Sequence, residues 1–307
     1  MEKKTDFQNK VIVVCGPTAS GKTSLAVELA KALSSEVISA DSMLVYKGLD
    51  IGTAKPTNEE RQGVPHHLID VASPFEKFSV SDYERLALPI LEELLAAGKT
   101  PIVCGGTGFY INALLFKSGF GGSGADENVR KKYEEILERE GKEYLHGLLK
   151  ERDAESAVIL HPNDTKRVIR ALEIFEVTGR KKSDQHDEPV PRFPYLCVSV
   201  DHPREVLYER IGIRVEEMFK AGLKEEVAAL LASGVSSECQ CMQGIGYKEV
   251  AYGLETGMSD EDIKEEVKKK TRNYAKRQIT FFKRMKNHVF LPPNEATVEK
   301  VLALLQE

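Results

Sequence analysis

The chain of 307 residues has no tryptophan, five cysteines and no long apolar run. A membrane-spanning helix needs roughly 20 apolar residues, and no stretch of the sequence approaches that length. The N-terminal segment is polar and lacks the apolar core of a signal peptide. An odd number of cysteines, mostly in or beside apolar segments, is typical of reduced thiols in a cytosolic protein. We therefore expect a cytoplasmic protein that makes no contact with a membrane.

Charge is distributed unevenly along the chain. The formal net charge is −5, yet the segment 268–287 contains nine Lys or Arg and no acid. A basic helix in an otherwise acidic protein favours a local contact with a polyanion, although a solvated helix face is the plain alternative. Cys239 and Cys241 form a C-x-C without a second pair at zinc-finger spacing, which argues against a metal site there.

Short apolar segments alternate with helical patterns, which predicts a parallel sheet with helical crossovers. The clearest strand is Val11 to Cys15, because every residue in it is apolar, as in a strand buried on both faces. We expect further strands at 36–40, 100–104, 195–200 and 289–291, and an apolar stretch at 65–71. Helices are expected after residue 23 and at 79–97, 109–116, 203–221, 223–232, 247–255 and 259–286, with one more at the end.

The pattern changes at residue 117. Residues 118–126 are glycine-rich and turn-like, and the chain from 129 to 179 contains only helical signals, at 128–140, 142–150 and 164–177. We interpret 117–192 as a helical insertion. Residues 1–116 and 193–307 are then expected to form one α/β core, a parallel sheet like that of P-loop NTPases, with a helical C-terminal part.

A phosphate-binding loop follows the first strand. It fits the pattern G-x-x-x-x-G-K-[ST] and comprises Gly16, Pro17, Thr18, Ala19, Ser20, Gly21, Lys22 and Thr23. Such a loop points backbone N–H groups and the positive end of a helix dipole at an anion. Lys22 supplies a cation, and the Thr23 hydroxyl is a ligand for Mg²⁺. The residues identify an oligophosphate site without identifying the oligophosphate.

Two features of a nucleoside triphosphatase are missing from the sequence. The strand 101–104 ends in Gly105-Gly106-Thr107, where a Walker B strand would end in Asp. No N-K-x-D guanine signature occurs in the chain. The loop is therefore expected to hold a diphosphate that leaves, and not a triphosphate that is cleaved.

Asp41 ends the second predicted strand, at the edge of a doubly wound sheet where ligands bind. Three roles are open to it from position alone. It could reach Mg²⁺ through water, act as a general base, or cap the following helix. The segment 50–56 that follows is rich in turn formers, and such loops often carry function.

Taken together, these motifs resemble those of the tRNA dimethylallyltransferases, the bacterial enzymes that prenylate the adenosine next to the anticodon. The resemblance extends from Val11 to about Leu291. Its motifs are GPTASGKT at 16–23, ADS at 40–42, IGTAKP at 51–56, GVPHHLID at 63–70, GGTGFYINALL at 105–115, KRVIRALEIFEVTG at 166–179, RVEEMFKAGLKEEV at 214–227, QGIGYKEV at 243–250 and TRNYAKRQITFFKR at 271–284. The chain has Phe281-Phe282 where the family commonly has a Trp in the basic helix.

The resemblance implies a reaction and its catalytic groups. Adenosine N6 would attack the allylic carbon of dimethylallyl diphosphate, in tRNAs that read codons beginning with U, and diphosphate would leave. Asp41 would be the base, while Thr107 and Arg214 would act on the leaving diphosphate together with the loop and Mg²⁺. The protein would work as a monomer.

The resemblance also implies where the anticodon stem-loop of tRNA binds, with the insertion gripping the stem. The expected contacts are Asp41, Ser42, Met43, Leu44, Thr107, Arg130, Lys166, Arg167, Val168, Ile169, Arg170, Gly244, Tyr247, Lys248, Lys276 and Arg277. We expect the basic helix to follow RNA phosphates without reaching the diphosphate pocket. The rival interpretations are a small-molecule kinase with the same loop and an RNA-binding NTPase module without catalytic activity.

Overall fold

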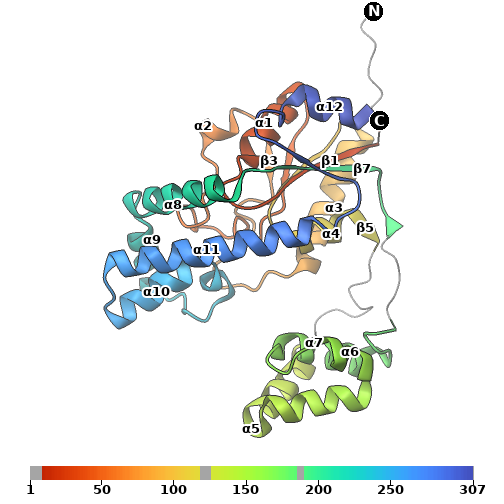
Figure 1. The fold of residues 1–307 in the computed structure, drawn as a ribbon, viewed down its shortest axis with the longest axis vertical. Coiled ribbons are helices and arrows are strands. Elements are labelled where there is room, and N and C mark those ends of the chain that lie inside the picture. The colour runs from red at the N-terminus through yellow and green to blue at the C-terminus, as the bar shows by residue number, and fades with distance from the viewer. Residues whose placement is uncertain (1–8, 118–125, 185–189, 307) are drawn as a thin grey trace, which may run out of the picture. The chain divides into compact units, whose positions relative to one another are not determined.

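A computed structural model describes residues 9–117, 126–184 and 190–306 (Figure 1). The chain forms two compact units. Met1–Leu115 and Arg192–Glu307 make up the first, which we call the core unit, and Phe116–Pro191 makes up the second, the insertion unit. These bounds lie within a residue of the division expected from the sequence. Most of the glycine-rich segment 118–126 lies outside the described residues.

The core unit is built on a six-stranded sheet in which every neighbouring pair is parallel. The strand order is β3 (His66–His67), β2 (Val37–Ser39), β4 (Ile102–Gly105), β1 (Val11–Cys15), β7 (Tyr195–Val200) and β8 (His288–Leu291). All five residues of β1 are fully buried. The α/β class and the parallel sheet predicted from alternating strands and helices are confirmed.

Helices cover the sheet and supply the walls of the site. Helix α1 (Lys22–Ala32) packs with α12 (Val298–Gln306) on the residues of β1 that point to one face, Ile12 and Val14. Ser79 and Asp82 form a capping box at the start of α3 (Val80–Ala96), which contacts α4 (Gly108–Leu115). The remaining helices are α2 (Asn58–Arg61), α8 (Arg204–Lys220), α9 (Leu223–Ala232), the 3₁₀ helix η1 (Gln240–Gln243), α10 (Tyr247–Thr256) and α11 (Asp260–Phe282).

The longest helix of the C-terminal part, α11, ends four residues earlier than expected. It stops at Phe282, so the last cations of the basic segment lie beyond the helix. It packs along α8, where Ala275 meets Leu207 and Ile211. Figure 1 shows α11 running beside α8 across the core unit.

Among its described residues, the insertion unit contains helices, turns and a short antiparallel pairing of β5 (Phe116–Lys117) with β6 (Val190–Pro191). Helix α5 (Glu127–Arg152) breaks at Gly141, whose φ of 86° no helix accommodates, so the expected division into two helices is real. Helices α6 (Ala154–Ile159) and α7 (Thr165–Thr178) complete the unit. Tyr133, Leu145 and Leu172 are buried together in its core. Helix α6 was not predicted, because six residues are too few to show a helical period.

Within the part of the chain that the structure describes, no helix has the length and apolarity that a membrane crossing demands. All five cysteines are free thiols.

Candidate active site

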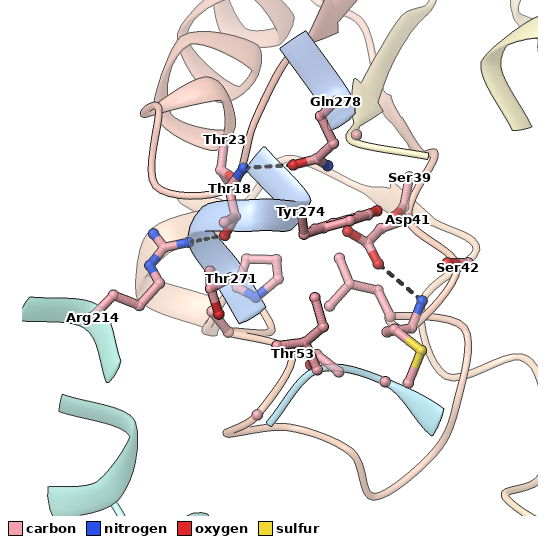
Figure 2. Close-up of a pocket in the computed structure, with 18 of the residues that line it drawn as sticks. Thr18, Thr23, Ser39, Asp41, Ser42, Thr53, Arg214, Thr271, Tyr274 and Gln278 are labelled. Atoms are coloured by element: carbon pink, nitrogen blue, oxygen red, sulfur yellow. Dashed lines mark hydrogen bonds between the residues drawn. The ribbon is translucent and has the colours of Figure 1, made fainter. Parts of the chain in front are cut away.

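A cavity of about 460 Å³ opens at the carboxyl ends of β1, β2 and β4 in the core unit. One part of its lining is polar and comes from the phosphate-binding loop and Arg214, while another is apolar and includes Leu44, Pro56 and Ile69. A cavity with a cationic and an apolar part fits a ligand with an anionic head and a hydrocarbon tail. Figure 2 shows the polar residues that converge on it.

The phosphate-binding loop has the conformation that its motif predicts. Gly16 and Gly21 both adopt positive φ, and α1 begins at Lys22, so the positive end of the helix faces the cavity. Thr18, Lys22 and Thr23 line the cavity. The rest of the loop serves as support, since Ala19 is buried against α8 and α11 and Ser20 is buried as well.

Two cations lie at the loop. The Lys22 Nζ donates to the Pro17 carbonyl at 3.3 Å, and the Arg214 Nη1 donates to the Thr18 hydroxyl at 3.3 Å. Burial lowers the pKa of Lys22, and burial together with the charge of Arg210 lowers the pKa of Arg214. Both groups therefore gain when an anion enters the cavity and offsets their loss of water. The structure thus brings Arg214 to the loop from a helix almost 200 residues further along the chain.

Asp41 and Thr107 lie side by side because they follow the neighbouring strands β2 and β4. Asp41 lines the cavity, and its Oδ1 accepts a hydrogen bond from the Met43 N–H at 2.9 Å. The Thr107 hydroxyl accepts from the Ser42 N–H at 3.0 Å and lies 3.3 Å from the Ser42 hydroxyl. Thr107 is not among the residues that line the cavity in the described structure. Its observed contact is the hydrogen bond that supports the Asp41–Ser42 turn, and its expected action on the leaving diphosphate stays a prediction.

Among the residues that line the cavity, Thr23, Asp41 and Ser39 carry side-chain oxygens of the kind that bind Mg²⁺. The Thr23 hydroxyl and the Asp41 carboxylate line the cavity together with Ser39, whose buried hydroxyl has no hydrogen-bond partner among the described residues. Hydroxyl and carboxylate oxygens with room for water and substrate oxygens are the ligands Mg²⁺ prefers. Figure 2 shows Thr23 on the side of the phosphate-binding loop, apart from Asp41 and Ser39.

The expectation that the basic helix does not reach the pocket is wrong. Thr271, Tyr274, Arg277 and Gln278 of α11 all line the cavity. Burial and, after it, the charge of Asp41 raise the pKa of Tyr274 to about 12, so its hydroxyl stays protonated. The signal that could have shown this was the spacing of Thr271, Tyr274 and Gln278, which places three hydrogen-bonding side chains on one helix face.

A carboxylate from another helix fixes the loop 50–56. Glu226 of α9 accepts hydrogen bonds from the N–H groups of Asp50, Ile51 and Gly52 at 2.8 to 3.1 Å. It also accepts one from the Tyr247 hydroxyl at 2.6 Å. Gly52, Thr53, Ala54 and Pro56 line the cavity, so Glu226 holds one wall in place. No sequence pattern indicates this role, because Glu226 lies in an ordinary amphipathic helix.

Most of the core-unit residues that we expect to contact tRNA line the cavity. Ser42, Met43, Leu44 and Gly244 line the cavity, and Lys248 is exposed, donating to the Gln243 side chain at 3.1 Å. Tyr247 is only 1% exposed, and its hydroxyl is bonded to Glu226. Its side chain is part of the cavity wall, and its expected contact with RNA stays a prediction.

In the insertion unit, several expected RNA contacts have structural roles. Val168 and Ile169 are buried in the core of the unit, so their side chains cannot touch RNA and that prediction is wrong for them. Arg130 and Arg170 both pair with Glu173, which is fully buried, at 3.0 and 2.9 Å. Lys166 and Arg167 are exposed. A buried carboxylate needs such partners, and this need accounts for two of the cations.

The basic segment 268–287 is less free than its sequence suggests. Lys268 pairs with Glu216 and Glu265, and Lys269 and Lys270 pair with Glu266. Lys276 and Arg277 are exposed and make no ion pair within the described residues. The cationic surface of α11 is therefore confined to its C-terminal half.

The chain matches two family models. The model described as IPP transferase matches residues 44–285, and the one described as isopentenyl transferase matches residues 9–77. Among curated relatives, the tRNA dimethylallyltransferase of Acetivibrio thermocellus is 44% identical over 290 residues, which is 94% of this chain and 93% of that protein. The tRNA dimethylallyltransferase of Thermoanaerobacter sp. is 44% identical over 89% of each chain.

Solved structures agree with this assignment. The tRNA isopentenylpyrophosphate transferase of Bacillus halodurans has a TM-score of 0.71 at 40% identity, covering 97% of this chain and 94% of its own. A eukaryotic dimethylallyltransferase described as acting on tRNA has a TM-score of 0.80 at 32% identity, covering 94% of this chain and 74% of its own. The chain belongs to the tRNA dimethylallyltransferase family of IPP transferases.

Proposed function

We propose that this protein transfers a dimethylallyl group from dimethylallyl diphosphate to N6 of the adenosine next to the anticodon, in tRNAs that read codons beginning with U. The observation that carries the proposal is one cavity with cations at the phosphate-binding loop, an apolar wall and a carboxylate at Asp41. The cations match the diphosphate, the apolar wall matches the dimethylallyl group, and the carboxylate matches the N6 amine of adenosine.

The leaving group needs cations. As the bond between the allylic carbon and the diphosphate oxygen breaks, its electron pair goes to the diphosphate. The growing negative charge is bound by Lys22, Arg214 and the loop N–H groups. These groups bind the diphosphate more tightly in the transition state than in the bound substrate, which lowers the barrier. Mg²⁺ held by the Thr23 hydroxyl would supply further neutralisation of the diphosphate when bound.

The nucleophile needs a base. The lone pair of N6 is delocalised into the adenine ring, and a carboxylate that accepts a proton from N6 increases its electron density. Two observations support Asp41 in this role: the Met43 N–H holds one of its oxygens, and the carboxylate faces the cavity near Tyr274 (Figure 2). A new bond joins N6 to the allylic carbon, and the proton passes to Asp41.

The target adenine must leave its stack in the RNA to enter the cavity. A single-stranded loop of tRNA allows this at low cost. Lys276, Arg277 and Lys248 would hold the anticodon loop at the core unit, and Lys166 and Arg167 would hold the stem at the insertion unit. We expect the protein to act as a monomer in the cytoplasm.

The test is direct. The protein is incubated with dimethylallyl diphosphate, Mg²⁺ and an unmodified anticodon stem-loop RNA, and the nucleosides are analysed by mass spectrometry. The proposal predicts a prenylated adenosine and one diphosphate released for each. A parallel reaction with ATP tests the kinase alternative, which predicts ATP consumption and no prenylated nucleoside and would replace the proposal if that result were found.

A further inference from the structure

Gln278 is a buried polar side chain between two parts of the site. It is 6% exposed, and it lies in α11 immediately after the exposed cations Lys276 and Arg277. Its Oε1 accepts a hydrogen bond from the Thr18 N–H of the phosphate-binding loop at 3.2 Å. Its Nε2 donates to the Gly106 carbonyl at 2.9 Å. Figure 2 shows the first of these bonds.

The fit around the amide is close. A Cβ on Gly106 would lie 2.2 Å from the Gln278 Nε2, so only glycine leaves room for this contact. Gly106 precedes Thr107, whose N–H donates to the Ala40 carbonyl next to Asp41. The Gln278 side chain therefore joins the loop that would hold the diphosphate to the turn that contains Asp41.

The position of Gln278 on α11 gives these bonds a further consequence. Lys276 and Arg277 precede it on the same helix, and a helix moves as a stiff rod over one turn. RNA phosphates bound to these cations would restrict α11, and with it the amide of Gln278. A restricted amide holds Thr18 and Gly106 in one geometry, so less conformational freedom remains to be lost when the diphosphate binds.

We propose that Gln278 is a positioning residue that couples tRNA binding on α11 to dimethylallyl diphosphate binding at the phosphate-binding loop. The proposal rests on the proposed function of the site. Coupling of this kind is reciprocal, so each ligand raises the affinity for the other by the same factor.

The experiment measures dimethylallyl diphosphate affinity by calorimetry, with and without saturating anticodon stem-loop RNA in which the target adenosine is replaced by purine riboside, which lacks the N6 amine and cannot react. The ratio of the two affinities is the coupling factor. For the unaltered protein we expect a ratio of about 5 or more. For Gln278→Leu, which removes both hydrogen bonds, we expect a ratio near one with thermal unfolding still cooperative. Thr280→Ala, an exposed change two residues along α11, is the matched control and should keep the full ratio.

The outcomes separate coupling from support. A merely structural role of Gln278 predicts lower affinity for both ligands and an unchanged ratio, and that result would overturn the proposal. A ratio near one in the unaltered protein would overturn it too. If Gln278→Leu does not fold, Gln278→Glu keeps the acceptor for Thr18 and loses the donor to Gly106, and the same ratio decides. If the unaltered protein bound neither ligand, the proposed function itself would fail.

Discussion

The two ends of the cavity differ in charge and in how they are held. The loop end carries Lys22 and Arg214. It is supported by contacts from distant helices, such as the hydrogen bond that the Arg210 Nε donates to the Ala19 carbonyl at 2.7 Å. The acceptor end carries Asp41, and it is held by a local bond from the Met43 N–H and by the bond from the Ser42 N–H to Thr107 after the neighbouring strand β4. The cavity therefore draws electrons toward one end and a proton toward the other. Changes at the two ends should have different kinetic signatures.

The largest effect is expected at the acceptor end. Asp41→Asn keeps an oxygen for the Met43 N–H but cannot accept a proton from N6. Loss of a general base costs roughly 10²–10⁴ in rate. We expect single-turnover prenylation to fall by about that factor while the affinities for RNA and dimethylallyl diphosphate stay within a few-fold. A rate close to that of the unaltered protein would show that the base is elsewhere.

At the loop end we expect a loss of binding. Lys22→Ala removes a charged donor that burial has deprived of water, and such bonds contribute about 1.5–3 kcal/mol. Dimethylallyl diphosphate affinity should fall by roughly 10- to 100-fold with RNA affinity unchanged, as calorimetry can measure. Lys31→Ala, at the exposed end of the same helix, is the control and should leave both affinities unchanged. An equal loss in both variants would place the anion away from the loop.

A smaller effect is expected on RNA binding, where two lysines of α11 with different ion pairing can be compared. Lys276→Gln removes an exposed cation without an ion pair in the described structure, whereas Lys269→Gln removes one that pairs with Glu266. A phosphate contact contributes up to about 0.9 to the slope of log affinity against log salt. Filter binding should show a lower slope and a several-fold weaker RNA affinity for Lys276→Gln alone. Equal slopes in the two variants would mean that this face of α11 is merely solvated.

The smallest effect is expected at the cavity wall. Glu226→Ala leaves the N–H groups of Asp50, Ile51 and Gly52 without their shared acceptor. Because the wall loosens and the reacting groups stay, the KM for dimethylallyl diphosphate should rise a few-fold and kcat should change little. Glu225→Ala, the exposed neighbour, controls for the loss of charge. A fall in kcat with KM unchanged would mean that the loop 50–56 acts on the chemistry and not on binding.

The sequence predicted those parts of the molecule that have a local signature. The run Val11 to Cys15, the phosphate motif after it and the helical insertion each follow from residues close together in the chain. The place of Arg214 at the loop came from the family resemblance alone, since nothing near it in the sequence indicates a partner in Thr18. Local patterns thus define elements, and they locate a site only where one element carries most of it.

Contacts between distant elements were the parts that could not be predicted. Gln278 and Tyr274 sit in a segment whose Lys and Arg content suggested RNA, and only the packing of α11 shows that its other face reaches the cavity. The same applies to Val168, whose burial follows from the fold of the insertion unit, and to Lys268, whose acidic partner Glu216 is on α8. A charge run alone does not distinguish neutralised cations from free ones.

The order of the strands also determines when the molecule can be completed during synthesis. Strand β1 is first along the chain but lies between β4 and β7, and β8 at the edge of the sheet is made nearly last. The insertion unit, whose helices contact one another locally, can fold on emerging from the ribosome, while β1 still lacks a partner on one side. A chain that stops before β7 would leave one edge of the apolar strand β1 unpaired, and it would be a ready substrate for proteases and for aggregation.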